Sequence, residues 1–182
     1  MLKSSFIALS LTIGLGASSA FAGMMVGGAE MFPAKNIIEN AVNSKDHTTL
    51  VAAVKAAGLV ETLQSAGPFT VFAPTNDAFA ALPAGTVDGL LKPEAKATLT
   101  KVLTCHVIAA NAMSDAVMKM VDDDGGMHKV KTVGGCELTL KYKDGKVMVE
   151  DETGGVATVT IADVAQSNGV IHVIDKVLLP KM

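Results

Sequence analysis

The spacing of apolar residues changes partway along the chain, and this change most constrains the fold. In the first half apolar residues recur at helical spacing, as at Ile37, Ile38 and Val42. From about Cys105 onward, short runs rich in Val, Thr and Ile replace that pattern, and Asp144-Gly145 separates two alternating runs as a hairpin turn does. Helices followed by strands predict a single α+β domain.

Turn and capping residues divide this domain into elements. Gly58 ends one helical run, Gly67-Pro68 follows another, and Thr75-Asn76-Asp77 supplies capping side chains for a third. No internal repeat is present. We predict helices over 37–42, 45–57, 59–65, 77–82, 87–91 and 94–103, and strands over 69–73, 105–109, 129–132, 137–143, 146–150, 158–162 and 169–179.

The amino-terminal segment has the features of a secretory signal peptide. Lys3 provides the positive charge, the stretch over residues 6–17 is apolar, and Ala20-Phe21-Ala22 provides the small residues of a cleavage site. A membrane anchor is the alternative, but a spanning helix needs roughly 20 apolar residues. We predict cleavage after Ala22, a secreted or periplasmic protein without a transmembrane segment, a flexible leader over residues 23–35, and the domain proper over residues 36–180.

An exported chain with two cysteines, Cys105 and Cys136, favours one disulfide bridge between them, because oxidising compartments preserve such bonds. A reactive thiol and a metal thiolate pair are the alternatives. Neither has a supporting C-x-x-C pattern.

Composition excludes some kinds of partner. The chain has no tryptophan, one tyrosine and a net charge of -3, and all its cations are lysines. Arginine is the residue best suited to read bases and phosphates, and flat aromatic rings form stacking platforms. We therefore expect no nucleic-acid binding.

Two segments resemble the signature segments of fasciclin domains. They are Thr70-Val71-Phe72-Ala73-Pro74-Thr75-Asn76-Asp77-Ala78-Phe79-Ala80-Ala81-Leu82 and Asn168-Gly169-Val170-Ile171-His172-Val173-Ile174-Asp175-Lys176-Val177-Leu178-Leu179-Pro180. The resemblance implies a β-wedge of two packed sheets with several helices. It also implies adhesion to, or interaction with, a cell-surface or matrix protein or polysaccharide, without catalysis, cofactor or metal. We expect a monomer.

The resemblance also suggests contact residues. Cys105-His106-Val107-Ile108 stands where the family has a Tyr-His motif, and Asp163-Val164 resembles the Asp-Ile pair associated with integrin binding in animal members. A histidine at a helix-to-strand junction is more often a structural residue with its hydrogen bonds satisfied than a residue that contacts a partner. The same holds for the signature residues Thr75, Asn76, Asp77, His172 and Asp175, which the residues themselves explain as helix caps and as buried polar groups that need partners.

Two other functions remain open at this stage. A periplasmic copper protein would use thioether and imidazole ligands. An extracytoplasmic hydrolase would need a nucleophile beside a base. However, Cys105 and His106 are adjacent and point to opposite faces if they lie on a strand. The candidate copper ligands are Met24, Met25, Met31, Met113, Met118, Met120, Met127 and His128.

Overall fold

The computed structural model describes residues 23–181, so the predicted signal peptide lies outside the described residues. The helices are α1 (Ile37–Ala41), η1 (Lys45–His47), α2 (Thr48–Ala57), α3 (Val60–Gln64), α4 (Asn76–Ala80), α5 (Thr86–Leu90), η2 (Pro93–Ala95), α6 (Lys96–Thr104) and α7 (Ser114–Asp123). The strands are β1 (Met24–Val26), β2 (Ala29–Met31), β3 (Phe69–Pro74), β4 (Val107–Ile108), β5 (Met127–Lys131), β6 (Glu137–Lys143), β7 (Lys146–Glu150), β8 (Val156–Gln166) and β9 (Gly169–Ile174).

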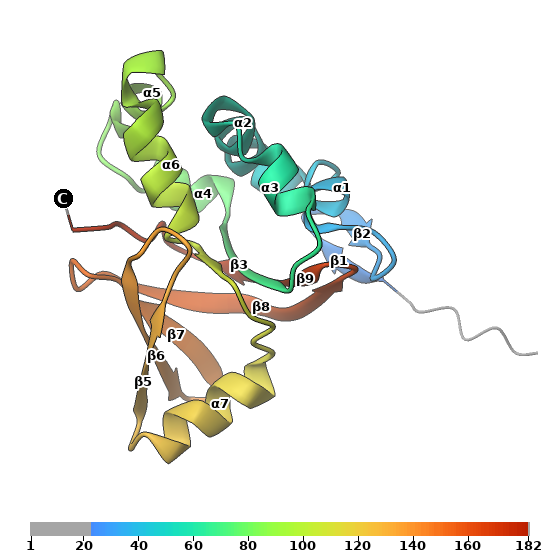
Figure 1. The fold of residues 1–182 in the computed structure, drawn as a ribbon, viewed down its shortest axis with the longest axis vertical. Helices are drawn as coiled ribbons and strands as arrows, with labels where there is room; N and C mark the ends of the chain where they lie inside the picture. Colours follow the sequence, from blue (N-terminus) through green and yellow to red (C-terminus); the bar gives the residue numbers. More distant parts are fainter. Residues whose placement is uncertain (1–22, 182) are drawn as a thin grey trace, which may run out of the picture.

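Seven strands form one mixed sheet in the order β4-β3-β9-β8-β7-β6-β5, and β1 pairs with β2 in a separate small sheet. The pair β3 and β9 is parallel, and the other neighbours are antiparallel. Irregularities along β8 let the sheet change direction, so that β5, β6 and β7 run across β3 and β9 (Figure 1). The sheet therefore has two arms, one with β4, β3 and β9 and the other with β7, β6 and β5. These arms form the expected wedge, and the predicted α+β class is confirmed.

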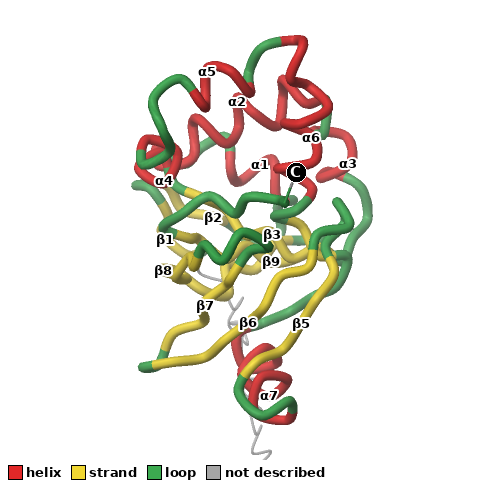
Figure 2. Tube along the Cα trace, turned by 90° about the vertical axis from the view of Figure 1, so that its left-hand side faces the viewer, coloured by secondary structure: helices red, strands yellow, loops and turns green. Residues whose placement is uncertain are grey.

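Helices cover both faces of the central strands. Figure 2 shows α1 to α6 on one side of β3 and β9, and α7 on the other side, against the arm of β5 to β7. Because β3 and β9 are covered on both faces, Phe72 and Ile174 lie in the core that α7 closes, whereas Val71, Ala73 and Ile171 lie in the core beneath the other helices. The signature segments therefore supply the central strands of the fold.

Several local predictions match the structure. Gly58 ends α2 in the left-handed conformation with φ 76°, and Asp144 and Gly145 form the turn between β6 and β7 with φ values of 53° and 78°. Leu99 and Leu103 on α6 are buried. These features agree with the sequence because each depends on a few neighbouring residues.

The structure differs from the flexible leader that we predict over residues 23–35, because most of this segment is ordered. Residues 24–31 form the β1–β2 hairpin, and Val26 and Met31 are each 1% exposed. Gly27 and Gly28 take positive φ values of 58° and 74°, as a two-residue primed hairpin turn requires. The hairpin packs on the helical core, so the packed unit extends at least to residue 24.

Helix α7 was not predicted, because the second half of the chain reads mainly as strands. Val117 and Val121, one helical turn apart, are each 1% exposed and pack with Leu138 and Leu140 of β6. The last predicted strand also ends earlier, at Ile174 rather than at residue 179. No helix in residues 23–181 is both long and apolar enough to span a bilayer.

Candidate interaction site

The segment Cys105–Ile108 lies at the corner where α6 ends and β4 begins. Its four side chains are buried, with exposed fractions of 1%, 2%, 6% and 4% in chain order. The structure therefore places the resemblance-based contact motif inside the domain. In this conformation none of the four side chains is available to a macromolecular partner.

His106 has both ring nitrogens hydrogen-bonded to the backbone. The Leu178 N–H donates to Nε2 over 2.9 Å, so Nδ1 carries the proton and donates to the Val102 carbonyl over 2.8 Å. Burial lowers the pKa of His106 to about 4, although the Val102 carbonyl and the Asp151 carboxylate act in the opposite direction. The neutral imidazole joins the end of α6 to the carboxy-terminal segment, which is a structural arrangement.

The disulfide between Cys105 and Cys136 is formed, with its two Cα atoms 5.4 Å apart. It ties the end of α6 to the β5–β6 turn, residues 132–136. Two backbone hydrogen bonds support the same junction, from Val133 N–H to the Val107 carbonyl and from Gly134 N–H to the Thr104 carbonyl. Since Cys105 is in the bridge, it does not offer a thiolate nucleophile.

Asp163 holds the start of α7. It lies at an irregularity of β8 with φ 60°, and its Oδ1 accepts from the Ser114 N–H over 2.7 Å while Oδ2 accepts from the Ser114 hydroxyl. A carboxylate at a helix amino terminus satisfies free N–H groups and is favoured by the helix dipole. Asp163 is half-buried and the adjacent Val164 is fully buried. Asp163 and Val164 therefore have structural roles, one as an acceptor for the first residue of α7 and the other in the core.

His172 is buried next to Asp163 and hydrogen-bonds the backbone on both sides of its ring. Its Nδ1 accepts from the Asp163 backbone N–H over 3.2 Å, and its Nε2 donates to the Ala112 carbonyl over 2.7 Å. Burial lowers the pKa of His172, so the ring is neutral near pH 7. Ser114, His172 and Asp163 are close, but the carboxylate accepts from the serine, whereas the hydrogen bonds of the imidazole go only to backbone groups. The set therefore lacks the serine-to-imidazole contact of a nucleophile and base.

The remaining signature residues connect elements. Thr75 Oγ1 accepts from the Ala78 N–H at the start of α4. Asn76 joins α4 to α2, because its Oδ1 accepts from the Thr49 N–H over 3.0 Å and its Nδ2 donates to the Lys45 carbonyl over 2.8 Å. Asp77 lies in the first turn of α4.

Asp175 lies just beyond β9, where its Oδ1 accepts from the Thr158 N–H over 2.7 Å. The predicted strand over residues 169–179 includes Asp175, and the sequence explanation for this residue was a buried polar group, but Asp175 is exposed. The strand ends one residue earlier, and the Asp175 side chain instead holds β8 against the end of β9.

The methionines of the copper hypothesis are spread over separate parts of the fold. Met31 is buried in the core, Met24 and Met25 are both exposed on β1, and Met127 is the first residue of β5, next to His128. His128 Nδ1 lies 2.6 Å from an Asp124 carboxylate oxygen. In residues 23–181 no group of three or more His, Cys, Asp or Glu side chains could hold a metal.

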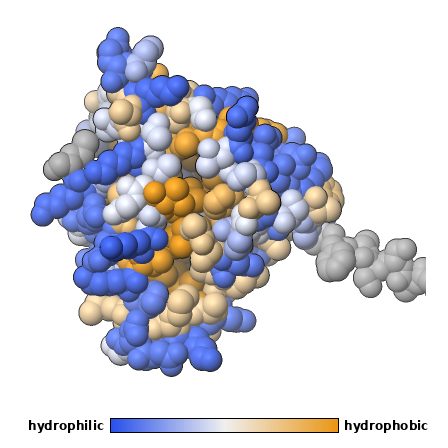
Figure 3. Space-filling model, viewed as in Figure 1, coloured by the Kyte–Doolittle hydropathy of each residue, from blue (hydrophilic) through white to orange (hydrophobic). Residues whose placement is uncertain are grey.

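One feature was not predicted from the sequence: a hollow between the helices and the sheet, which we call the apolar pocket. It lies among α1, α2, α3, α6 and the strands β3 and β4, and its lining includes the buried His47. Figure 3 shows apolar residues gathered at the centre of one face, between the helices and the β5–β6 turn. The available sequence signal was a single histidine, His47, at the polar start of the helical run over residues 45–57.

Comparison with known proteins identifies related sequences and a related fold. The fasciclin domain model matches residues 45–180. Protein sll1483 of Synechocystis is 54% identical over 149 residues, covering 82% of this chain and 76% of that protein. Immunogenic protein MPB70 of Mycobacterium bovis is 35% identical over 145 residues, covering 77% of this chain and 66% of that protein.

A similar region occurs in a larger animal protein. The transforming growth factor-beta-induced protein ig-h3 of pig (Sus scrofa) is 38% identical over 131 residues, which cover 72% of this chain and 17% of that protein. Among solved structures, a FAS1 domain pair from the insect cell adhesion molecule Fasciclin I matches with a TM-score of 0.57 and 25% identity. The match covers 71% of this chain and 43% of that chain.

Proposed function

Since the chain belongs to the fasciclin domain family, we propose that it is an exported, non-catalytic module that binds a partner at a cell surface or in a matrix. The observation that carries the proposal is the structural use of the reactive side chains. Cys105 is in a disulfide, and His106 and His172 are neutral, buried and bonded to backbone. Because the cysteine and the two histidines have structural roles, they do not act as a nucleophile and a base. This supports a role in binding rather than in catalysis.

Similar proteins support the class of partner. The insect structure belongs to a protein described as a cell adhesion molecule, and a 39% identical region occurs in a cell surface glycolipoprotein of Mycobacterium bovis. The amino-terminal pattern ending at Ala22 supports export. The disulfide agrees with an oxidising compartment.

We further propose that Cys105 to Ile108 act indirectly, by bracing the β5–β6 turn that meets the partner. The disulfide and the Val133–Val107 hydrogen bond fix this turn at the corner. Val133 itself is 46% exposed. An exposed apolar side chain on a rigid support can bury its surface at an interface with little loss of conformational entropy.

The test compares attachment of cells that lack the protein with cells complemented by variants. We expect deletion to reduce attachment to surfaces or to other cells, wild type to restore it, and Val133→Ser to restore it only partly. Val42→Ser is the matched control, because Val42 is 48% exposed on a different part of the molecule. Unchanged attachment after deletion would refute the adhesion proposal, and equal behaviour of the two valine variants would refute the assignment to the turn.

A further inference from the structure

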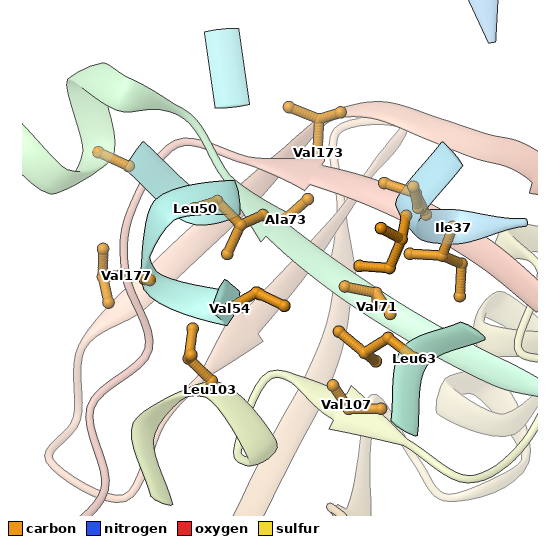
Figure 4. Close-up of a cluster of buried hydrophobic side chains, with 14 of the residues drawn as sticks. Ile37, Leu50, Val54, Leu63, Val71, Ala73, Leu103, Val107, Val173 and Val177 are labelled. Atoms are coloured by element: carbon orange, nitrogen blue, oxygen red, sulfur yellow. The ribbon is translucent and has the colours of Figure 1, made fainter. Parts of the chain in front are cut away.

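Side chains fill the interior beneath the helices, so a partner has to bind on the surface. Figure 4 shows Leu50, Val54, Val71 and Leu103, from α2, β3 and α6, close together in the core beneath α1 to α6. The void that remains in the apolar pocket is too small for a sugar, a peptide or a lipid chain. The outer face of the arm formed by β5, β6 and β7 is the surface whose charge stands apart from that of the rest of the chain.

This arm has one buried and one open face. Leu138, Leu140 and Val149 lie on the face that packs against α7 (Figure 2). The residues that alternate with them point to the opposite side, because successive side chains of a strand point to opposite faces. We call this open side the lysine face, after its five lysines Lys129, Lys131, Lys141, Lys143 and Lys146.

The lysine face carries an excess of positive charge on an acidic protein. The chain has 15 lysines and 18 acidic residues, but β5, β6 and β7 contain five of these lysines and only two glutamates. Each glutamate pairs with one lysine, since Lys129 Nζ lies 2.7 Å from Glu137 and Lys141 pairs with Glu150. The other three lysines make no ion pair within residues 23–181. Such a surplus of one sign attracts ions of the opposite sign.

The three unpaired lysines lie at the two ends of the face. Lys131 ends β5, beside the β5–β6 turn and opposite Glu137. Lys143 and Lys146 are directly opposite each other at the turn between β6 and β7. Like charges in a cross-strand pair destabilise a sheet, and Asp144 in this turn makes no ion pair in the described part of the chain. The two ends are about 20 Å apart along β6, at the usual rise of about 3.4 Å per residue.

The other side chains of the face favour one kind of polyanion. The face has no aromatic residue and one exposed large apolar residue, Met127, whereas protein partners usually dock on aromatic and aliphatic anchors. A flat membrane fits a twisted arm of a sheet poorly. Thr139 of β6 and Thr158 of the neighbouring strand β8 add hydroxyl groups, which both donate to and accept from the hydroxyls of a sugar.

We propose that the lysine face binds an acidic polysaccharide, whose sugar carboxylates contact the unpaired lysines at both ends. The proposal rests on the partner-binding function proposed above and names the class of partner. A single sugar acid reaches one end only, whereas a polymer bound at one end is held at a high effective concentration at the other. A linear polymer also follows the twist of the arm. The face borders the β5–β6 turn, so both surfaces can meet the same partner.

The test uses the folded, disulfide-bonded protein with polygalacturonate as the probe, and with galacturonic acid and uncharged dextran as controls. Isothermal titration gives the affinities. We expect polygalacturonate to bind at least about a hundredfold more tightly than galacturonic acid, because it engages both ends. Dextran should not bind, and added salt should weaken polygalacturonate binding, because neutralising a polyanion releases its counterions. Equal affinities for polymer and monomer, or binding of dextran, would overturn the proposal.

Two double variants separate the lysine face from general attraction between charges. Lys143→Gln/Lys146→Gln removes one end of the face and should weaken polygalacturonate binding at least about tenfold. Urea unfolding should show no loss of stability, because the variant relieves a repulsion between like charges. Lys92→Gln/Lys96→Gln is the matched control, since it removes two exposed lysines near the start of α6, and it should keep the wild-type affinity. Equal weakening in both double variants would overturn the assignment to this face.

Two further probes represent the other classes of partner. Phosphatidylglycerol vesicles present an anionic membrane, and poly-glutamate presents an acidic polypeptide. Both should bind more weakly than polygalacturonate at the same concentration of negative charge. Vesicles or poly-glutamate that bind as tightly as polygalacturonate would overturn the choice of a polysaccharide. All these measurements use purified protein, so their failure leaves the attachment of cells, tested by deletion, as a separate result.

Discussion

The buried histidines His106 and His172 accept hydrogen bonds from backbone N–H groups, and this dictates their response to acid. Protonation of His106 Nε2 would set two donors against each other at the Leu178 N–H. Protonation of His172 Nδ1 would do the same at the Asp163 N–H. Both rings must therefore stay neutral for the native hydrogen bonds to persist.

This predicts a loss of stability between neutral pH and about pH 4. Above the ordinary histidine pKa of 6.5 both the folded and the unfolded states are neutral, so the stability is fully present. As pH falls toward 4, the unfolded state takes up protons that the folded state refuses, and the free energy of unfolding decreases. For His106, whose folded pKa is about 4, the loss between pH 7 and pH 5 is about 2 kcal/mol.

Urea unfolding at pH 7, 6 and 5 measures this slope. His106→Gln should be less stable at pH 7 but should show a shallower decline, because the titrating ring is gone. Met25→Gln is the control, since Met25 is 61% exposed and carries no titrating group, and it should keep the wild-type slope. A free energy of unfolding that is constant from pH 7 to pH 5 in the wild-type protein would contradict the prediction.

Asp163 offers a second test at the residue scale. Asp163→Ala removes the acceptors of both Ser114 hydrogen bonds and should cost about 1–2 kcal/mol, the usual range for a helix cap combined with a dipole contact. Asp163→Asn keeps one carbonyl oxygen and tolerates a positive φ, so its loss should be smaller. Chemical denaturation gives both values. Equal losses in the two variants would show that the carboxylate does not act as a cap.

At the scale of elements, the β1–β2 hairpin is a fixed part of the domain. Met31→Ala should cost about 2–5 kcal/mol, as expected for truncation of a buried side chain. Met25→Ala is the matched control, because Met25 is 61% exposed on the same hairpin, and it should change stability by less than about 0.5 kcal/mol. Thermal and urea unfolding measure the difference. Similar values for the two variants would restore the view of residues 23–35 as a flexible leader.

The disulfide connects two other elements, α6 and the β5–β6 turn. Its cysteines are 31 residues apart, and a loop of this length corresponds to about 3–4 kcal/mol in the chain-entropy model. A Cys105→Ala/Cys136→Ala double variant should lose roughly this amount, measured by urea unfolding against the oxidised protein. Identical unfolding midpoints would show that the hydrogen bonds of the turn hold the corner without the bridge.

Sequence patterns predicted most of the elements whose signals are local. Gly58 and Asp144-Gly145 mark an end and a turn through their own backbone preferences. Helix α7 also has a local signal, because Met113, Val117, Met120 and Val121 follow the spacing of one helical face. It was missed because the second half of the chain reads mainly as strands.

In the candidate site, too, some features could be predicted from the sequence and others could not. The cysteine pair could be predicted from composition and compartment, but the burial of His106 depends on Leu178, which is 72 residues away along the chain. The buried environment of His47 is formed by residues of α1, α2, α3, α6, β3 and β4, which are far apart in the sequence. No single segment contains the information for either environment.

At the scale of the whole molecule, two hydrophobic cores lie on opposite faces of β3 and β9. The core under α1 to α6 contains the apolar pocket, and the core under α7 is held by Asp163 and His172. A change that loosens α7 therefore acts on one face, while the pocket and the hairpin belong to the other. Of the two buried histidines that respond to acid, His172 supports the face of α7, whereas His106 lies in the lining of the apolar pocket.

The parallel pairing of β3 with β9 also determines when the chain can fold. Phe69 is opposite Gly169, so the two central strands meet only after nearly the whole domain has been synthesised. Contacts between segments so far apart in sequence close late and slow the folding reaction. A chain that stays unfolded until its end is available remains compatible with passage through a translocation channel, which the export proposed above would require.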